Sequence, residues 1–176
     1  MPEVVDPPLT ELGRQQAAGL QNRAVDLSPS LIVVSPLSRA TKTALIAFEH
    51  VVGEVPIIAH EDTREKIGVH TCDMRHSVRE AKVEYPTVDY SLLQSDVDDL
   101  WSADKRESSQ GVSDRAYSFM EWLRTRPEEE VVVASHSGWL LTLFNTVLTC
   151  DCEDLKTWFA TGEMRSVLIS YSDISE

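Results

Sequence analysis

The amino-acid sequence predicts an α/β fold, a three-layer sandwich in which helices flank a mostly parallel central sheet. Two continuous apolar runs, residues 31–34 and 131–134, are typical of buried strands, and the first is consistent with burial on both faces. Each run ends in a short polar loop, at residues 35–39 and 135–138, and a helical pattern follows each loop. Alternating strands and helices favour parallel pairing, because a parallel connection has to cross the sheet.

The first half of the sequence begins with an expected helix, which Thr10 can cap and whose apolar spacing continues to residue 24. The strand at 31–34 follows. Ser38 is the expected cap of a second helix that continues to about residue 49. Residues 55–58 predict another short strand, and Pro56 places it at the edge of the sheet because proline cannot donate to a neighbour.

The region from 61 to 110 has a looser pattern, with a helix expected at 77–85. It has too few apolar residues for a core of its own, so we interpret it as an insertion over one end of the sheet. The 176 residues then form a single domain, 1–176.

After the insertion the pattern becomes regular again. We expect an amphipathic helix at 113–126, the strand at 131–134 and a helix through residues 140–148. A short helix at 154–160 and a last strand at 166–171 complete the predicted elements.

Charge and composition exclude several classes of partner. The 29 acidic and 16 basic residues give a net charge of −13, which disfavours binding to nucleic acid or to an anionic membrane. The longest apolar run is too short to span a bilayer, and the first eight residues do not resemble a signal peptide. Three cysteines make no disulfide framework, so we expect reduced thiols and a cytoplasmic location.

Arg39 and His136 occupy equivalent positions, each in the loop that follows a predicted strand. The carboxyl ends of strands in an open α/β sheet are where ligands bind. Arginine presents a fork of donors that matches phosphate or carboxylate, and histidine can donate to an anion or exchange a proton. The pair therefore predicts an anion site, although a surface ion pair and a structural histidine remain alternatives.

Three further groups could carry chemistry. Glu65 could act as a general acid near a phosphate, or it could be an exposed carboxylate between two basic neighbours. Ser137 suggests a serine hydrolase, but Ser135 stands where the G-x-S-x-G pattern requires glycine. The spacing of His70, Cys72 and His76 matches no standard zinc pattern, so we expect no metal.

With these residues assembled, the sequence resembles the histidine phosphatase superfamily, which includes the phosphoglycerate mutases. Five motifs in the same order carry the resemblance: Asp6-Pro7-Pro8-Leu9-Thr10-Glu11-Leu12-Gly13 with Gln16, Ser35-Pro36-Leu37-Ser38-Arg39-Ala40 with Thr43 and Ala44, Arg64-Glu65 with Gly68, Ser135-His136-Ser137-Gly138, and Gly162-Glu163-Met164-Arg165-Ser166. The run from Gly68 to Asp73 is most similar to the eukaryotic phosphoglycerate mutase-like branch.

The resemblance implies a role for each candidate. Arg39 would hold the transferring phosphoryl group together with His136, the second histidine of the pocket, and Ser137. Glu65 would donate a proton to the leaving oxygen, and Glu163 would border the pocket. The ligand would be a phosphorylated small molecule or inorganic phosphate, and neither a cofactor nor a metal is expected.

The family also has an Arg-His-Gly signature on a first strand, whose histidine becomes phosphorylated. That motif occurs nowhere in the 176 residues. We therefore expect a sheet without its first strand and a chain, truncated or catalytically silent, with little phosphatase activity. The alternative is a catalytically dead module that binds a phospho-ligand or a protein. The strands could close up, pair across a homodimer or leave a marginally stable chain.

Overall fold

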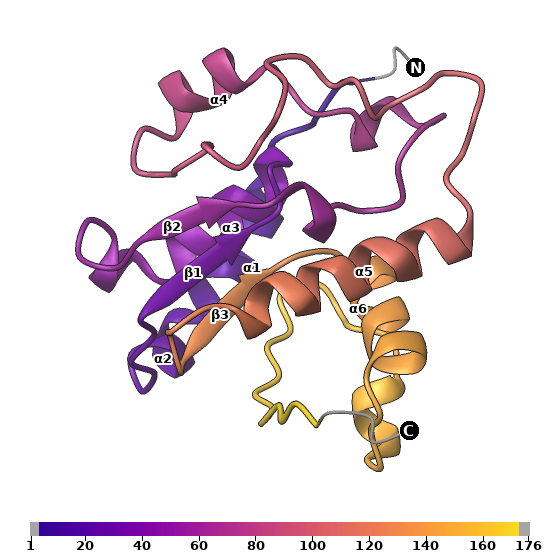
Figure 1. Cartoon of the computed structure of the whole chain (residues 1–176). Coiled ribbons are helices and arrows are strands. Elements are labelled where there is room, and N and C mark those ends of the chain that lie inside the picture. The colour runs from indigo at the N-terminus through magenta and orange to yellow at the C-terminus, as the bar shows by residue number, and fades with distance from the viewer. Residues whose placement is uncertain (1–3, 173–176) are drawn as a thin grey trace.

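The sheet of this protein has three parallel strands in the order β2-β1-β3 (Figure 1). A computed structural model describes residues 4–172 of the chain. The strands are β1 (Leu31–Val34), β2 (Ile57–Ala59) and β3 (Val131–Ala134). Ile32 is in register with Ile57 on one side and with Val132 on the other. The predicted parallel α/β fold is therefore confirmed, with β2 at an edge as Pro56 indicated.

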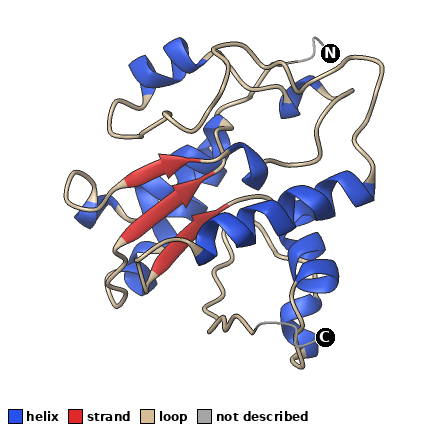
Figure 2. Cartoon of the chain, viewed as in Figure 1, coloured by secondary structure: helices blue, strands red, loops and turns tan. Residues whose placement is uncertain are grey.

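Helices cover both faces of the sheet (Figure 2). Ile32 and Val34 point into a cluster that includes residues of α2 and α3, whereas Leu31 and Val33 point into a second cluster with α5 and α6. The α-helices are α1 (Glu11–Gly19), α2 (Gln21–Ala24), α3 (Ser38–Ala47), α4 (Val78–Glu84), α5 (Ser109–Arg124) and α6 (Ser137–Thr142). Alternate side chains of one buried strand thus hold the three layers together.

The shorter helical segments include a π-helix at Leu143–Val147, which continues α6. The 3₁₀ turns are Glu49–Val51, Glu61–Thr63, Thr71–Asp73 and Glu153–Lys156. The predicted helix at 154–160 is therefore only a 3₁₀ turn, and the predicted helix through 140–148 changes its hydrogen-bonding pattern part-way.

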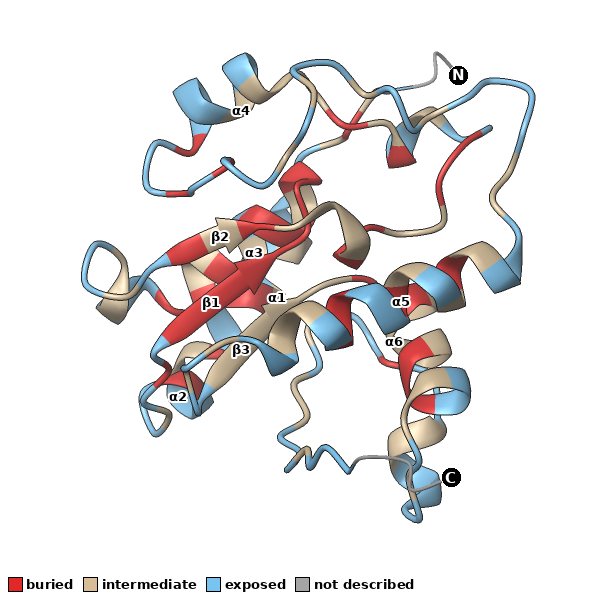
Figure 3. Cartoon of the chain, viewed as in Figure 1, coloured by how far each residue is buried: buried red, intermediate tan, exposed pale blue. Residues whose placement is uncertain are grey.

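Burial separates the two apolar runs that looked alike in the sequence. All four residues of β1 are fully buried, but every residue of β3 is only partly buried (Figure 3). The difference arises because β1 has a strand on each side, whereas β3 pairs only with β1 within residues 4–172. The prediction of burial on both faces is confirmed for 31–34, whereas the strand at 131–134, which was expected to be buried, is only partly so. Within residues 4–172 the three strands pair without a gap, and one edge of β3 is left unpaired.

The predicted strand at 166–171 is also wrong, because these residues have no regular secondary structure. Ile169 packs against the cluster under α5, the Tyr171 hydroxyl donates to the carbonyl of Met120, and Leu168 is fully exposed. A strand needs a neighbour for its backbone groups. Within the described part of the chain no strand lies beside this segment, although its sequence favours one.

Of the two expected helix caps, Thr10 is confirmed and Ser38 is wrong. Thr10 accepts a hydrogen bond from the backbone of Gly13 and so caps α1 as expected. Ser77 forms a capping box with Glu80 at the start of α4. Ser38, in contrast, does not cap α3: it is the first residue of the helix, and its hydroxyl donates to Asp6.

The segment from 60 to 108 crosses beside the N-terminal segment as a largely irregular layer (Figure 1). Tyr85, Val88 and Tyr90 of this segment belong to the same apolar cluster as β1 and α3. The insertion thus shares the core of the sheet instead of building its own. No helix within residues 4–172 is long and apolar enough to cross a bilayer.

His60, which follows β2, gives the fold a predicted sensitivity to acid. Its ring lies 4.6 Å from that of Trp122 and 5.3 Å from that of Phe119, and burial lowers its pKa from 6.5 to about 4. The unfolded chain therefore binds more protons between these values, so the free energy of unfolding should fall as the pH is lowered from 6.5 to about 4. The loss should reach about 3 kcal/mol at most.

Urea unfolding at several pH values measures this loss, and a His60→Gln variant should show a flatter profile than the unsubstituted chain. His50→Gln, at an exposed histidine, is the matched control and should keep the steep profile. Equal slopes for all three proteins would contradict the assignment to His60.

Candidate active site

The loops that follow β1 and β3 lie side by side, as parallel pairing predicted. The backbone N–H of Ser35 donates to the carbonyl of Ala134 at 2.9 Å. Two residues after Ala134, the Nε2 atom of His136 is 2.8 Å from the Ser35 hydroxyl. His136 is buried and precedes α6 directly. The structure therefore holds this imidazole at the junction of the two loops.

The surroundings of His136 are positively charged. Burial lowers the pKa of His136 well below its ordinary value, and the charges of Arg39, Arg64 and Arg115 lower the pKa further. The imidazole is consequently neutral at neutral pH. An anion beside it would offset the repulsion from the three guanidinium groups and would favour the protonated ring. All three arginines are also paired with carboxylates, those of Asp73, Asp98 and Glu107.

Glu65 lies directly beside the turn that carries His136. Its carboxylate accepts a hydrogen bond from the backbone of Gly138 at 3.3 Å and from that of Lys66 at 2.9 Å. A Cβ atom at position 138 would be 2.6 Å from Oε1 of Glu65, so a larger residue there would push the Glu65 carboxylate out of this position. The structure thus brings together two candidates that are far apart in the sequence.

Arg39, on the first turn of α3, contacts the insertion. Its guanidinium donates to the carbonyl of Cys72 at 2.6 Å and to the carboxylate of Asp73 at 2.9 Å. Asp73 is buried, so this is not a surface ion pair. Three of the five N–H donors of Arg39 have no partner among residues 4–172. Arg39 is therefore held in place and still has donors for an anion.

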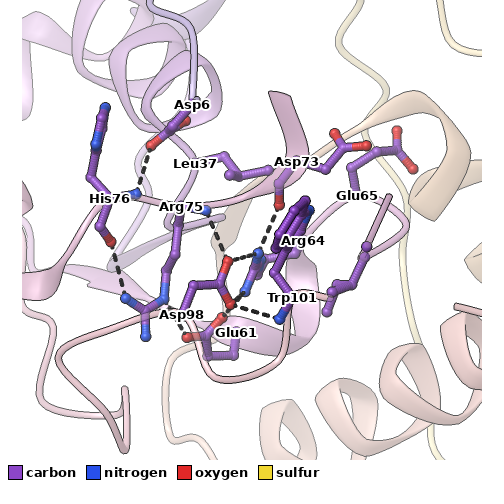
Figure 4. A network of polar contacts seen from close by, with 12 residues as sticks. Asp6, Leu37, Glu61, Arg64, Glu65, Asp73, Arg75, His76, Asp98 and Trp101 are labelled. Atoms are coloured by element: carbon purple, nitrogen blue, oxygen red, sulfur yellow. Dashed lines mark hydrogen bonds and ion pairs between the residues drawn. The ribbon is translucent and has the colours of Figure 1, made fainter. Parts of the chain in front are cut away.

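A buried network of charges surrounds Arg64, the residue before Glu65 (Figure 4). The guanidinium of Arg64 pairs with both carboxylate oxygens of Asp98 and also contacts Glu61. It donates as well to the carbonyl of Asp73, whose carboxylate pairs with Arg39. The side chains of Arg64 and Asp98 are 0% exposed. The network therefore ties distant parts of the insertion to one another.

Comparison with known proteins identifies the family. The family model described as "Histidine phosphatase superfamily (branch 1)" matches residues 2–173. The chain belongs to the histidine phosphatase superfamily. A phosphoglycerate mutase-like protein of Arabidopsis thaliana is 35% identical over an alignment 198 positions long. The alignment covers 93% of this chain and 73% of the relative. A second such protein of A. thaliana is 31% identical and covers 93% and 70% of the two chains.

Solved structures of histidine phosphatases share the fold. The α-ribazole phosphatase of Shigella flexneri superimposes with a TM-score of 0.61 at 23% identity, over 88% of this chain and 75% of that one. A mycobacterial glucosyl-3-phosphoglycerate phosphatase gives a TM-score of 0.58 at 22% identity, over 89% and 77%. That phosphatase has also been solved with inorganic phosphate, in a structure with a TM-score of 0.53 at 22% identity over 81% and 71% of the two chains.

The hydroxyl of Ser137 is directed away from the junction of the loops in this histidine phosphatase chain. It donates to the carbonyl of Phe159 at 3.1 Å, which ties α6 to the C-terminal region. Only the backbone N–H of Ser137 therefore remains for a ligand. The same contact leaves the hydroxyl without the basic partner that a serine nucleophile requires.

Glu163 lies outside the candidate site formed around His136. Its carboxylate accepts from the backbone of Ala160 and pairs with Arg165. It lines an open groove together with Gln16 and Arg23, and that groove includes none of Arg39, Glu65 and His136. The structure does not bring Glu163 to the predicted pocket.

Three residues that support the site were not singled out in the sequence. Asp6 is buried and accepts hydrogen bonds from the backbone and the hydroxyl of Ser38, at 2.8 and 2.9 Å. Ser35 and Asp73 contact His136 and Arg39 directly. Asp6 and Ser35 lie within motifs of the resemblance, which was the available signal, whereas nothing local marked Asp73 as buried.

The candidate zinc residues do not come together. Within residues 4–172, no group of three histidine, cysteine, aspartate or glutamate side chains could hold a metal ion. Cys72, Cys150 and Cys152 are free thiols.

Proposed function

We propose that this chain binds the phosphoryl group of a phosphomonoester, or inorganic phosphate, between Arg39 and His136. The observation that carries the proposal is the position of the buried His136 imidazole at the junction of the two loops, with the guanidinium of Arg39 close enough to affect its pKa. Arg39 also keeps three N–H donors without a partner among residues 4–172. Family membership supports phosphate as the anion, and so does the phosphate complex of the mycobacterial phosphatase.

The resemblance assigns Glu65 the role of proton donor to the leaving oxygen. Its carboxylate lies beside the backbone of Gly138, within the turn that carries His136. In the family reaction a histidine nitrogen attacks phosphorus and the P–O bond to the alcohol breaks. The departing oxygen then takes a proton, and water attacks the phosphohistidine. Glu65 can serve the proton transfers of such a sequence.

The nucleophile of that sequence is the histidine of Arg-His-Gly, and the 176 residues contain no such motif. We therefore propose that the 176-residue chain binds phosphate without appreciable turnover. This agrees with the second candidate function, a phospho-ligand-binding module, because Arg39 and His136 are sufficient for binding but not for the covalent step.

Isothermal titration with inorganic phosphate tests binding, and hydrolysis of p-nitrophenyl phosphate tests turnover. Arg39→Met should weaken phosphate binding at least about tenfold, since it removes charge-assisted hydrogen bonds. Arg79→Met is the matched control, because the Arg79 side chain is 86% exposed. We expect unchanged phosphate binding for Arg79→Met and no turnover by the unsubstituted chain.

Phosphate binding and the absence of turnover are contradicted by different results. Absence of phosphate binding by the unsubstituted chain would refute the binding site. Turnover of p-nitrophenyl phosphate that disappears in His136→Ala would refute the claim of binding without catalysis.

A further inference from the structure

The carboxylate of Asp73 lies between two arginines at the edge of the proposed site. Its Oδ1 atom accepts from Arg39 at 2.9 Å, and its Oδ2 atom accepts from Arg106 at 2.9 Å. Asp73 is buried, whereas both arginine side chains are about a quarter exposed, 25% for Arg39 and 28% for Arg106. One buried carboxylate therefore brings two partly exposed guanidinium groups close together.

The backbone around Asp73 is fixed by several contacts. Gly68 and Val69 both have positive φ, 89° and 65°, and the second value is strained for a β-branched residue. Val69 donates to the carbonyl of Ser102 at 2.8 Å, and Arg106 donates to the carbonyl of Gly68. The segment before Asp73 and the segment before α5 thus hold each other in place.

Arg106 resembles Arg39 in the donors that it leaves unused. Both of its contacts, to Gly68 and to Asp73, use the Nη1 atom. The donors on Nε and Nη2 have no partner among residues 4–172, so three N–H groups remain, as for Arg39. The two guanidinium groups and the carboxylate between them carry a net charge of +1, which favours an anion near both arginines.

We propose that Asp73 is a positioning residue that pairs Arg39 with Arg106, and that Arg106 is a second anion-binding arginine of this site. The inference rests on the proposed function, because it assigns Arg106 to the same phosphoryl group that Arg39 binds. Asp73 holds both guanidinium groups in place before the anion binds, which lowers the entropic cost of ordering two flexible side chains. Asp73 acts through the arginines and does not itself contact the anion.

The first experiment changes the charge of Asp73. Asp73→Asn should weaken the binding of inorganic phosphate about tenfold, because its amide can accept from one arginine but presents a donor to the other. Asp104→Asn removes the same charge from an exposed position in the same segment and should leave phosphate affinity unchanged. Tighter binding by Asp73→Asn would show that Asp73 competes with the ligand, and unchanged binding would remove its role. Either result overturns the proposal.

A spectroscopic readout separates positioning from a general loss of structure. In ¹H–¹⁵N spectra, phosphate should shift the Nε–H signals of both Arg39 and Arg106 in the unsubstituted chain. In Asp73→Asn these two signals should shift less at equal saturation, while backbone amide signals remain dispersed. An Arg106 signal that does not respond to phosphate in the unsubstituted chain would contradict its role.

The second experiment tests Arg106 without altering Asp73. Arg106→Met should weaken phosphate binding about tenfold, and Lys105→Met, which removes a charge from the adjacent exposed residue, should not. Normal affinity in Arg106→Met would overturn the inference while leaving the proposed function intact. Failure of the unsubstituted chain to bind phosphate would instead overturn the proposed function itself, so the two failures are distinguishable.

Discussion

Replacement of Arg64 by methionine is expected to lower the free energy of unfolding by about 3–5 kcal/mol, because it leaves a buried carboxylate without its charged partner. Asp98 is 0% exposed and accepts from Nη1 of Arg64 at 2.9 Å. Two backbone donors, those of Arg75 and Trp101, would remain. They cannot replace a guanidinium that contacts both oxygens of the carboxylate.

The pH dependence identifies the cause of that loss. Burial raises the pKa of Asp98, but the hydrogen bonds and charge of Arg64, with help from Arg75, outweigh burial and hold the pKa below 3.8. Without Arg64, burial should raise the pKa of Asp98 above its value in the unfolded chain. The folded variant would then bind the additional proton, so its deficit in unfolding free energy should shrink as the pH is lowered from neutral.

Denaturant unfolding measures this deficit, with Arg79→Met as the control. Arg79 is highly exposed and lies 4.0 Å from Asp96, so its removal should cost about 0.5 kcal/mol or less. Adding Asp98→Asn to Arg64→Met should recover part of the loss, because it removes the unpaired charge. An Arg64→Met chain as stable as the Arg79→Met chain would mean that the buried pair does not hold the insertion.

Local patterns in the sequence were enough to predict the elements that pack by their apolar periodicity. They located β1, β3 and α5, together with the cap at Thr10. Parallel pairing then placed His136 next to the loop that carries Arg39, before any contact was known. These successes have one physical basis, since periodic burial and capping depend on residues that are close in the chain.

The elements that were missed depend on partners far away in the chain. Residues 166–171 have strand-like composition, but pairing requires a neighbouring strand, which residues 4–172 do not supply there. Arg64 and Asp98 are 34 residues apart, and each looks like an ordinary surface charge in the sequence. Buried ion pairs help to fix the insertion, which has few apolar residues. The charge composition of a sequence does not reveal which of its charges will pair.

Replacement of Gly68 by alanine is expected to destabilise the chain by about 2–5 kcal/mol, through a strained backbone and a collision. The φ angle of Gly68 is +89°, and a Cβ atom there would lie only 2.0 Å from the carbonyl oxygen of Lys105. That oxygen belongs to the backbone, so the segment before α5 would have to move. Because Arg106 follows Lys105 directly and bonds to Gly68, the movement should also separate Arg106 from Asp73.

Gly53 separates the two sources of this cost, because its φ is +91° and a Cβ atom there would meet nothing within 4 Å. Gly53→Ala should therefore show the strain alone, about 1–2 kcal/mol, and should leave phosphate binding unchanged. The additional loss in Gly68→Ala, measured by urea unfolding, then reports the collision, and phosphate titration reports its effect on the arginine pair. Equal losses in the two variants would mean that the contact between Gly68 and Lys105 is looser than the structure shows. The two segments are also joined by the backbone hydrogen bonds of Val69 with Ser102 and of Glu107 with Ile67, so a shift at Gly68 should carry the segment with Arg106 along with it.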